Sequence, residues 1–241
     1  MSDDFSVRVG KAVKHFWMTR ERQLKRQRSD GKQDKGTRGA VTGGAQLDGF
    51  VQLTAELLKE SGLRNSTIYQ KRLITLPGYF RPAKEWDLLV VVEGILIASI
   101  EFKSQVGPSF GNNFNNRAEE AIGSATDLWA AYREGVFSPS ARPWLGYFML
   151  LEETEKSVSP VSVGEPHFKV LPEYVESSYA KRYELLCRKL VRERLYDAAC
   201  FLMSDSKTGK QGIFKQPSQE LGIANFFSSL CARAAEFSKR Y

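Results

Sequence analysis

Two carboxylates and a lysine stand at the ends of two neighbouring apolar runs within residues 86–103, WDLLVVVEGILIASIEFK. Asp87 opens the first run, and Glu101 and Lys103 end the second. The Glu-Gly pair at residues 93–94 is typical of the tight turn of a β-hairpin. A hairpin brings the start of its first strand beside the end of its second. We therefore expect Asp87 to lie next to Glu101.

Charged side chains at the edge of an apolar sheet are costly to desolvate unless another group compensates them. Because strand side chains alternate between faces, Glu101 and Lys103 are expected to project together while Phe102 points into the opposite layer. A cation that prefers hard oxygen ligands, such as Mg²⁺, would compensate the carboxylates and leave the lysine to orient or activate a water. The competing interpretation is a chance Glu-x-Lys triplet at a solvated strand end. The upstream Asp87 and the hairpin spacing favour the catalytic interpretation.

The positive charge of the chain is concentrated at its start. The net charge is +7 over 241 residues, and residues 1–40 carry 11 lysines and arginines against 5 acidic residues. A basic arm on a nearly neutral body predicts contact with a polyanion, although a solvated helix with a soluble linker has the same composition. Together with the carboxylate cluster the arm favours nucleic acid, and Lys35 and Arg38 are its candidate DNA contacts.

Composition argues against several other classes of protein. No apolar run is long enough to span a bilayer, and the first residues lack the basic and apolar regions of an export signal. The three cysteines lie far apart, without the spacing of a zinc site. We expect a cytoplasmic protein with reduced thiols and no membrane contact.

Hydrophobic periodicity predicts an α/β (α+β-like) fold, in which helices flank a central mixed β-sheet and the C-terminal part is mostly helical. Besides the hairpin, strands are predicted at 66–76 and 144–151, and helices at 5–28, 46–61, 116–134, 180–204 and 220–238. The polar, Gly- and Asn-rich residues 104–117 are predicted as a loop. We divide the chain into a basic N-terminal helix and flexible arm (1–45), a catalytic core (46–160) and a helical C-terminal region (161–241) of the same compact domain.

The order of Asp, hairpin, Glu-x-Lys and following helix resembles the PD-(D/E)XK nuclease superfamily. Two longer segments, EFKSQVGPSFGNNFNNRAEEAIGSA at 101–125 and SYAKRYELLCRKLVRERLYDAA at 178–199, make the chain similar to the XhoI family of type II restriction endonucleases. The resemblance covers nearly the whole chain, and residues 101–125 are its most specific part. It departs at Trp86, where the superfamily has a proline. That proline is not chemically required, because the carboxylate after it does the binding.

The resemblance implies a restriction-endonuclease-like core that hydrolyses a DNA phosphodiester to a 5′-phosphate and a 3′-hydroxyl. Asp87, Glu101 and the main-chain carbonyl of Phe102 would bind Mg²⁺. Lys103 would position the attacking water or stabilise charge on the phosphate. Such enzymes often take a further acidic ligand from an early helix, and Glu56 is the candidate. The alternative role for Glu56 is that of a solvent-facing helix glutamate paired with a lysine three residues on.

The resemblance also implies a substrate and partners. XhoI-like enzymes cleave the palindrome CTCGAG and leave a four-base 5′ overhang. A palindrome calls for a two-fold protein, so double-stranded DNA and a second copy of this chain, in a homodimer, are the expected partners. A cognate DNA methyltransferase, without obligatory contact, is expected in the same bacterial restriction-modification system.

Base recognition must come from residues outside the catalytic triplet. Asparagine suits bidentate contact with adenine, and arginine with guanine, in the major groove. The candidates that follow the active strand are Gln105, Asn112, Asn113, Asn115, Asn116 and Arg117. Loop asparagines are also common turn-formers. A second basic loop is a candidate for phosphate contacts through Lys207, Lys210, Gln211 and Lys215.

Two other functions are consistent with part of this pattern. A structure-specific repair or recombination nuclease would share the catalytic core but would not need a base-reading Asn and Arg cluster. A non-catalytic DNA-binding module is disfavoured because all three catalytic side chains are present. A Mg²⁺-dependent, site-specific deoxyribonuclease would use both the three catalytic side chains and the Asn and Arg cluster.

Overall fold

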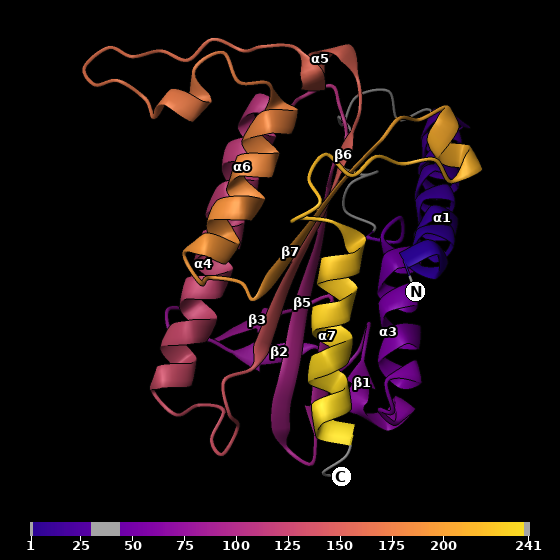
Figure 1. The fold of residues 1–241 in the computed structure, drawn as a ribbon, viewed down its shortest axis with the longest axis vertical. Helices are drawn as coiled ribbons and strands as arrows, with labels where there is room; N and C mark the ends of the chain where they lie inside the picture. Colours follow the sequence, from indigo (N-terminus) through magenta and orange to yellow (C-terminus); the bar gives the residue numbers. More distant parts are fainter. Residues whose placement is uncertain (1, 30–43, 239–241) are drawn as a thin grey trace.

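A five-stranded mixed β-sheet forms the centre of the protein, whose computed structural model describes residues 2–29 and 44–238. The strands lie in the order β1-β4-β5-β6-β7 (Figure 1). Their bounds are Ile68–Tyr69 for β1, Leu88–Val92 for β4, Ile95–Gln105 for β5, Trp144–Glu152 for β6 and Ala198–Ser204 for β7. The pairs β1–β4 and β4–β5 are antiparallel, whereas β5–β6 and β6–β7 are parallel. The predicted mixed sheet is confirmed.

The predicted hairpin is confirmed as β4 and β5. Residues 93–94 connect the two strands, both with positive φ (50° and 78°), as a two-residue type I′ turn requires. Leu88 pairs with Ile100 across the hairpin. Asp87, one residue before β4, therefore lies opposite Glu101, and the predicted proximity of the two is confirmed; a register shift between Val90 and Val91 sets this pairing.

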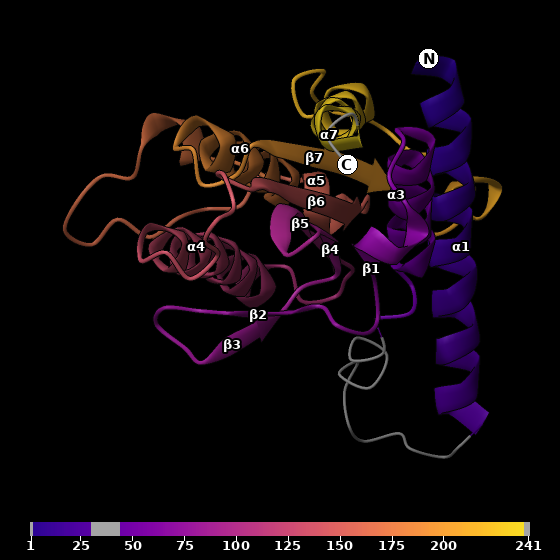
Figure 2. The same ribbon diagram turned by 90° about the horizontal axis from the view of Figure 1, so that it is seen from below.

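Helices cover both faces of the sheet. The helices on one face are α1 (Ser2–Ser29), α3 (Asp48–Glu60) and α7 (Ile223–Ser238), and those on the other are α4 (Gly111–Arg133) and α6 (Tyr179–Arg192) (Figure 1, Figure 2). The helices predicted at the two ends of the chain and at 46–61 are thereby confirmed. Each face has its own hydrophobic core, which explains why the central strands are apolar throughout.

Alternation along the central strands decides which side the charged groups of β5 face. Phe148 of β6 joins the core under α1, α3 and α7, and its neighbour Tyr147 joins the core under α4 and α6. Phe102 pairs with Phe148 and shares the first core. Glu101 pairs with Tyr147 and thus belongs to the α4 side. The predicted separation of Phe102 from Glu101 is confirmed.

A small second sheet lies beside the main one. β2 (Thr75–Pro77) pairs antiparallel with β3 (Ala83–Glu85). The predicted strand at 66–76 is in fact divided between β1 and β2, which belong to different sheets. The remaining short elements are α5 (Glu155–Val158) and the 3₁₀ turns η1 (Asn65–Thr67), η2 (Pro172–Tyr174) and η3 (Thr208–Gln211). In the described part of the chain, no helix has the length and apolar character that crossing a bilayer demands.

Two predicted elements are wrong. The predicted loop at 104–117 is confined to 106–110, because β5 runs to its last residue at 105 and α4 begins at 111. Phe110 is buried and Phe114 packs edge-on against Tyr183, so burial of two aromatic rings outweighs the turn preference of the surrounding asparagines. The predicted helix at 180–204 ends at 192, and its remaining part contains β7. Periodicity alone does not distinguish a buried strand from a helix in an apolar run such as AACFLMS.

Candidate active site

The two carboxylates of the hairpin are held by different partners. Asp87 is largely buried, and its Oδ2 accepts a hydrogen bond from the main-chain N–H of Phe102 at 2.7 Å. Glu101 is only 3% exposed, and its Oε1 lies 2.6 Å from Nζ of Lys103 and 3.1 Å from Nζ of Lys84. Oε2 of Glu101 is buried without a hydrogen-bond partner. Asp87 is therefore held by a backbone amide, whereas Glu101 pairs with two ammonium groups through Oε1 alone.

These surroundings shift the two pKa values in opposite directions. Burial raises the pKa of Asp87, and the hydrogen bond from Phe102 and the charge of Lys103 offset this only in part. Burial alone would also raise the pKa of Glu101, but the charges of Lys103 and Lys84 outweigh it, so the pKa is lowered. Glu101 is thus the fixed negative charge of the site, and Asp87 is the group that takes up a proton more readily.

Lys84 belongs to this cluster, although nothing in the sequence motif indicates it. It lies on β3 of the small sheet, and its ammonium sits 4.6 Å from the ring centroid of Trp86. Trp86 is itself buried. Lys84 and Trp86 are two residues apart, so strand alternation puts them on one face. That alternation is the only sequence signal, because the pairing of β3 with β2 that positions Lys84 cannot be read from the motif.

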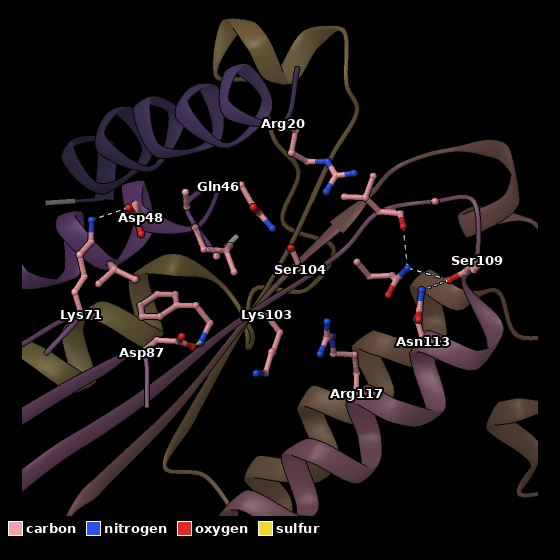
Figure 3. Close-up of a pocket in the computed structure, with 18 of the residues that line it drawn as sticks. Arg20, Gln46, Asp48, Lys71, Asp87, Lys103, Ser104, Ser109, Asn113 and Arg117 are labelled. Atoms are coloured by element: carbon pink, nitrogen blue, oxygen red, sulfur yellow. Dashed lines mark hydrogen bonds and ion pairs between the residues drawn. The ribbon is translucent and has the colours of Figure 1, made fainter. Parts of the chain in front are cut away.

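A pocket of about 860 Å³ opens beside the cluster at the end of β5. Asp87, Phe102 and Lys103 line it from the hairpin, and Arg117 lines it from α4. Figure 3 shows Lys103 and Arg117 at one part of this pocket, with Arg20 of α1 and Gln46 at another. The pocket thus connects the carboxylate cluster with polar side chains from both helical layers.

The predicted base-reading residues divide between the pocket and the outer surface. Gln105, Asn113 and Arg117 line the pocket. The remaining three asparagines, Asn112, Asn115 and Asn116, are exposed and do not line it. Because this segment is helical, successive residues point about 100° apart, and only one of the four asparagines faces inward. The interpretation of all four as one loop cluster is therefore wrong.

The second predicted patch lies around η3 and is partly neutralised by acidic neighbours. Lys210 pairs with Glu21 of α1 at 3.1 Å, and Lys215 pairs with Glu153. Lys207 and Gln211 are exposed. None of the four lines the pocket. Lys35 and Arg38 lie outside the described residues.

Glu56 is not brought to the carboxylate pair. Its Oε2 lies 3.3 Å from Nη2 of Arg8 on α1, so Arg8, and not Lys59, is its ionic partner. It does not line the pocket. The acidic residue of α3 that does so is Asp48, whose Oδ2 is 2.8 Å from Nζ of Lys71. The described residues contain no group of three or more His, Cys, Asp or Glu side chains arranged to hold a metal ion.

Comparison with known proteins is consistent with this geometry. The family model of restriction endonuclease XhoI matches residues 26–216. The type II restriction enzyme BstVI of Geobacillus stearothermophilus is 54% identical over 207 residues, which cover 84% of this chain and 92% of that enzyme. AbrI of Azospirillum brasilense is 49% identical over 167 residues (69% and 75%), and XhoI of Xanthomonas vasicola is 46% identical over 192 residues (78% and 75%). No solved structure matches the chain significantly.

Proposed function

Since the chain belongs to the restriction endonuclease XhoI family, we propose that it is a type II site-specific endonuclease that cleaves double-stranded DNA with Mg²⁺. The observation that carries this proposal is the juxtaposition of Asp87, Glu101 and Lys103, of which Asp87 and Lys103 also line a pocket with polar side chains. Two carboxylates and an ammonium are the groups that metal-assisted phosphodiester hydrolysis needs.

The residues present fit a hard divalent cation. Oε2 of Glu101 is a buried carboxylate oxygen without a donor, and burial leaves the charge of Asp87 poorly compensated. A cation held by Oε2 of Glu101, a carboxylate oxygen of Asp87 and the main-chain carbonyl of Phe102 would supply the missing positive charge. Water and phosphate would complete its coordination shell. Bound there, Mg²⁺ would polarise the phosphate and lower the pKa of a bound water. If a third carboxylate takes part, Asp48 is better placed than Glu56.

Each side chain of the cluster has a distinct role in this proposal. Asp87 must lose its proton before it can act as a ligand, because its pKa is raised. Lys103 orients the attacking water or stabilises charge on the phosphate. Lys84 does not line the pocket described above; it holds Glu101 ionised and oriented, which makes it a positioning residue.

The substrate and assembly extend the same proposal. We propose the palindrome CTCGAG, cut to leave a 5′ overhang, as the site of cleavage, because the sequence resemblance to XhoI-like enzymes implies it. Cleavage of both strands of a palindrome is best served by a homodimer that presents one active site to each strand. A cognate methyltransferase would protect the bacterial host DNA, and the enzyme would act on incoming DNA in the cytoplasm.

Digestion of a sequenced plasmid with Mg²⁺ present and then withheld tests the proposal. We expect discrete fragments with 5′-phosphate ends that map to one palindrome, and no cleavage without the metal. A ladder of fragments at branched or damaged DNA would instead indicate a structure-specific nuclease. Binding without cleavage under all conditions would indicate a DNA-binding module.

A further inference from the structure

Arg20 is a buried cation that no described residue neutralises through a hydrogen bond or ion pair. The side chain comes from α1 and enters the pocket beside the carboxylate cluster (Figure 3). It is 7% exposed. Glu152 is the acidic group that acts on it electrostatically, but the described residues show no ion pair between the two, and Oε2 of Glu152 accepts the N–H of Gly107 at 2.9 Å. The guanidinium is partly desolvated, has no acceptor among the described residues and faces the pocket, so the position suits a ligand that accepts hydrogen bonds.

Gln105 presents a hydrogen-bond acceptor to the pocket into which Arg20 presents donors. It is 3% exposed, and its Nε2 donates to the carbonyl oxygens of Val106 (3.0 Å) and Ser109 (3.1 Å). Two carbonyl acceptors fix the orientation of the amide, because only the nitrogen can donate to them. No described residue donates to Oε1. Gln105 is therefore a rigid hydrogen-bond acceptor, and Arg20 is a donor without partners.

A guanine–cytosine pair is the ligand that satisfies both residues. In the major groove guanine displays two acceptors, N7 and O6, and cytosine displays the N4 amino donor. We propose that Arg20 donates to the guanine and Gln105 accepts from the paired cytosine, so that the two residues read one G·C pair beside the cleaved phosphate. This inference rests on the proposed function, whose DNA substrate supplies the base pair.

Other ligands leave one of the two groups unsatisfied. A phosphate has only acceptors at neutral pH, so it would pair with Arg20 but place oxygen against the acceptor of Gln105. An A·T pair places the adenine N6 amino group against the arginine and the thymine O4 against the glutamine. Since DNA in the pocket would exclude water from both side chains, discrimination follows from the unpaired groups.

The test combines variants with a base analogue. The cleavage site is first mapped on plasmid DNA with the wild-type protein, so that failure at that step counts against the proposed function alone. Each guanine of the mapped site is then replaced in a synthetic duplex by 7-deazaguanine, which lacks the N7 acceptor. Binding is measured with Ca²⁺ in place of Mg²⁺. One such replacement should weaken wild-type binding by about 10-fold or more.

Arg20→Ala should weaken binding to the unmodified duplex by a similar factor and should lose no further affinity on the duplex with that 7-deazaguanine. This non-additivity places the residue and the base in direct contact. Gln105→Leu should relax discrimination at the same base pair. The matched control is Arg192→Ala, because Arg192 is exposed at the end of α6, lies outside the basic arm and does not line the pocket. The control should retain wild-type binding and analogue sensitivity.

Three results would overturn the assignment. In the first, Arg20→Ala binds every duplex more weakly by the same factor and still responds to 7-deazaguanine as the wild type does. Arg20 would then be a phosphate contact. The second is unchanged binding, and the third is a mapped site without a G·C pair. If Arg20→Ala fails to fold in a thermal melt, Arg20→Lys replaces it, because lysine keeps the charge but loses the bidentate geometry, and the same cycle then decides.

Discussion

The carboxylate cluster and the adjoining polar pocket both contain buried polar side chains, but they are incomplete in different ways. In the cluster, Glu101 already has two ammonium partners, whereas its Oε2 and the charge of Asp87 still lack positive charge. In the pocket, Arg20 and Gln105 lack a hydrogen-bond acceptor and donor, respectively. A bound cation would therefore complete the cluster, and a base pair would complete the pocket. Changes to the first should affect catalysis, and changes to the second should affect which DNA is bound.

The largest effect is expected from Asp87→Asn. Removal of one carboxylate ligand should lower cleavage by roughly 10³-fold or more, while DNA binding without metal should persist. Asparagine keeps an oxygen that can accept from the N–H of Phe102 and removes a poorly compensated buried charge. The melting temperature should therefore rise, by about 2–4 °C for each kcal/mol gained. Single-turnover cleavage, gel shift and thermal melting check these outcomes, and undiminished cleavage would refute the ligand role.

Lys103→Ala should reduce turnover by about 10²–10³-fold. Because Lys84 continues to compensate Glu101, the melting temperature should change little. Turnover and melting measured on the same preparation separate chemistry from folding. A thermal loss as marked as the kinetic loss would mean that the role of Lys103 is structural.

A smaller effect is expected from Lys84→Met, which we predict to lower turnover by about 10-fold at limiting Mg²⁺. Loss of one ammonium raises the pKa of Glu101, so the pH profile should shift upward and high Mg²⁺ should restore part of the activity. Lys84→Arg should rescue the profile. Lys181→Met is the control, because Lys181 pairs with Glu184 away from the site. If the profile of Lys84→Met stays in place, Lys84 does not act through Glu101.

The smallest effect concerns stability against pH in metal-free protein. The raised pKa of Asp87 means that its contribution to stability is lost as pH rises through that pKa. The lowered pKa of Glu101 means that its contribution is lost as pH falls through that pKa. Asp87→Asn should abolish the first dependence and leave the second, which melting curves across the acid range will detect. If the melting temperature of Asp87→Asn still falls as pH rises through this range, as in the wild type, the assignment is contradicted.

The sequence predicted the hairpin well because its contacts are local. The two-residue turn brings Asp87 to the end of β5, and a register shift between Val90 and Val91, which the sequence did not indicate, sets it opposite Glu101 and not Ile100. Lys84 and Arg20 could not be found in this way, because a separate two-stranded sheet and the packing of α1 bring them to the site. The start of α4 and strand β7 were missed because aromatic burial and sheet pairing outweigh local preferences.

The most direct test of the central claim is a crystal structure of the protein with its mapped duplex and Mn²⁺, located by anomalous scattering. The proposal predicts Mn²⁺ between the carboxylates of Asp87 and Glu101, with Lys103 beside the cleaved phosphate. Mn²⁺ bound at another group of ligands, with these two carboxylates metal-free next to the duplex, would contradict it.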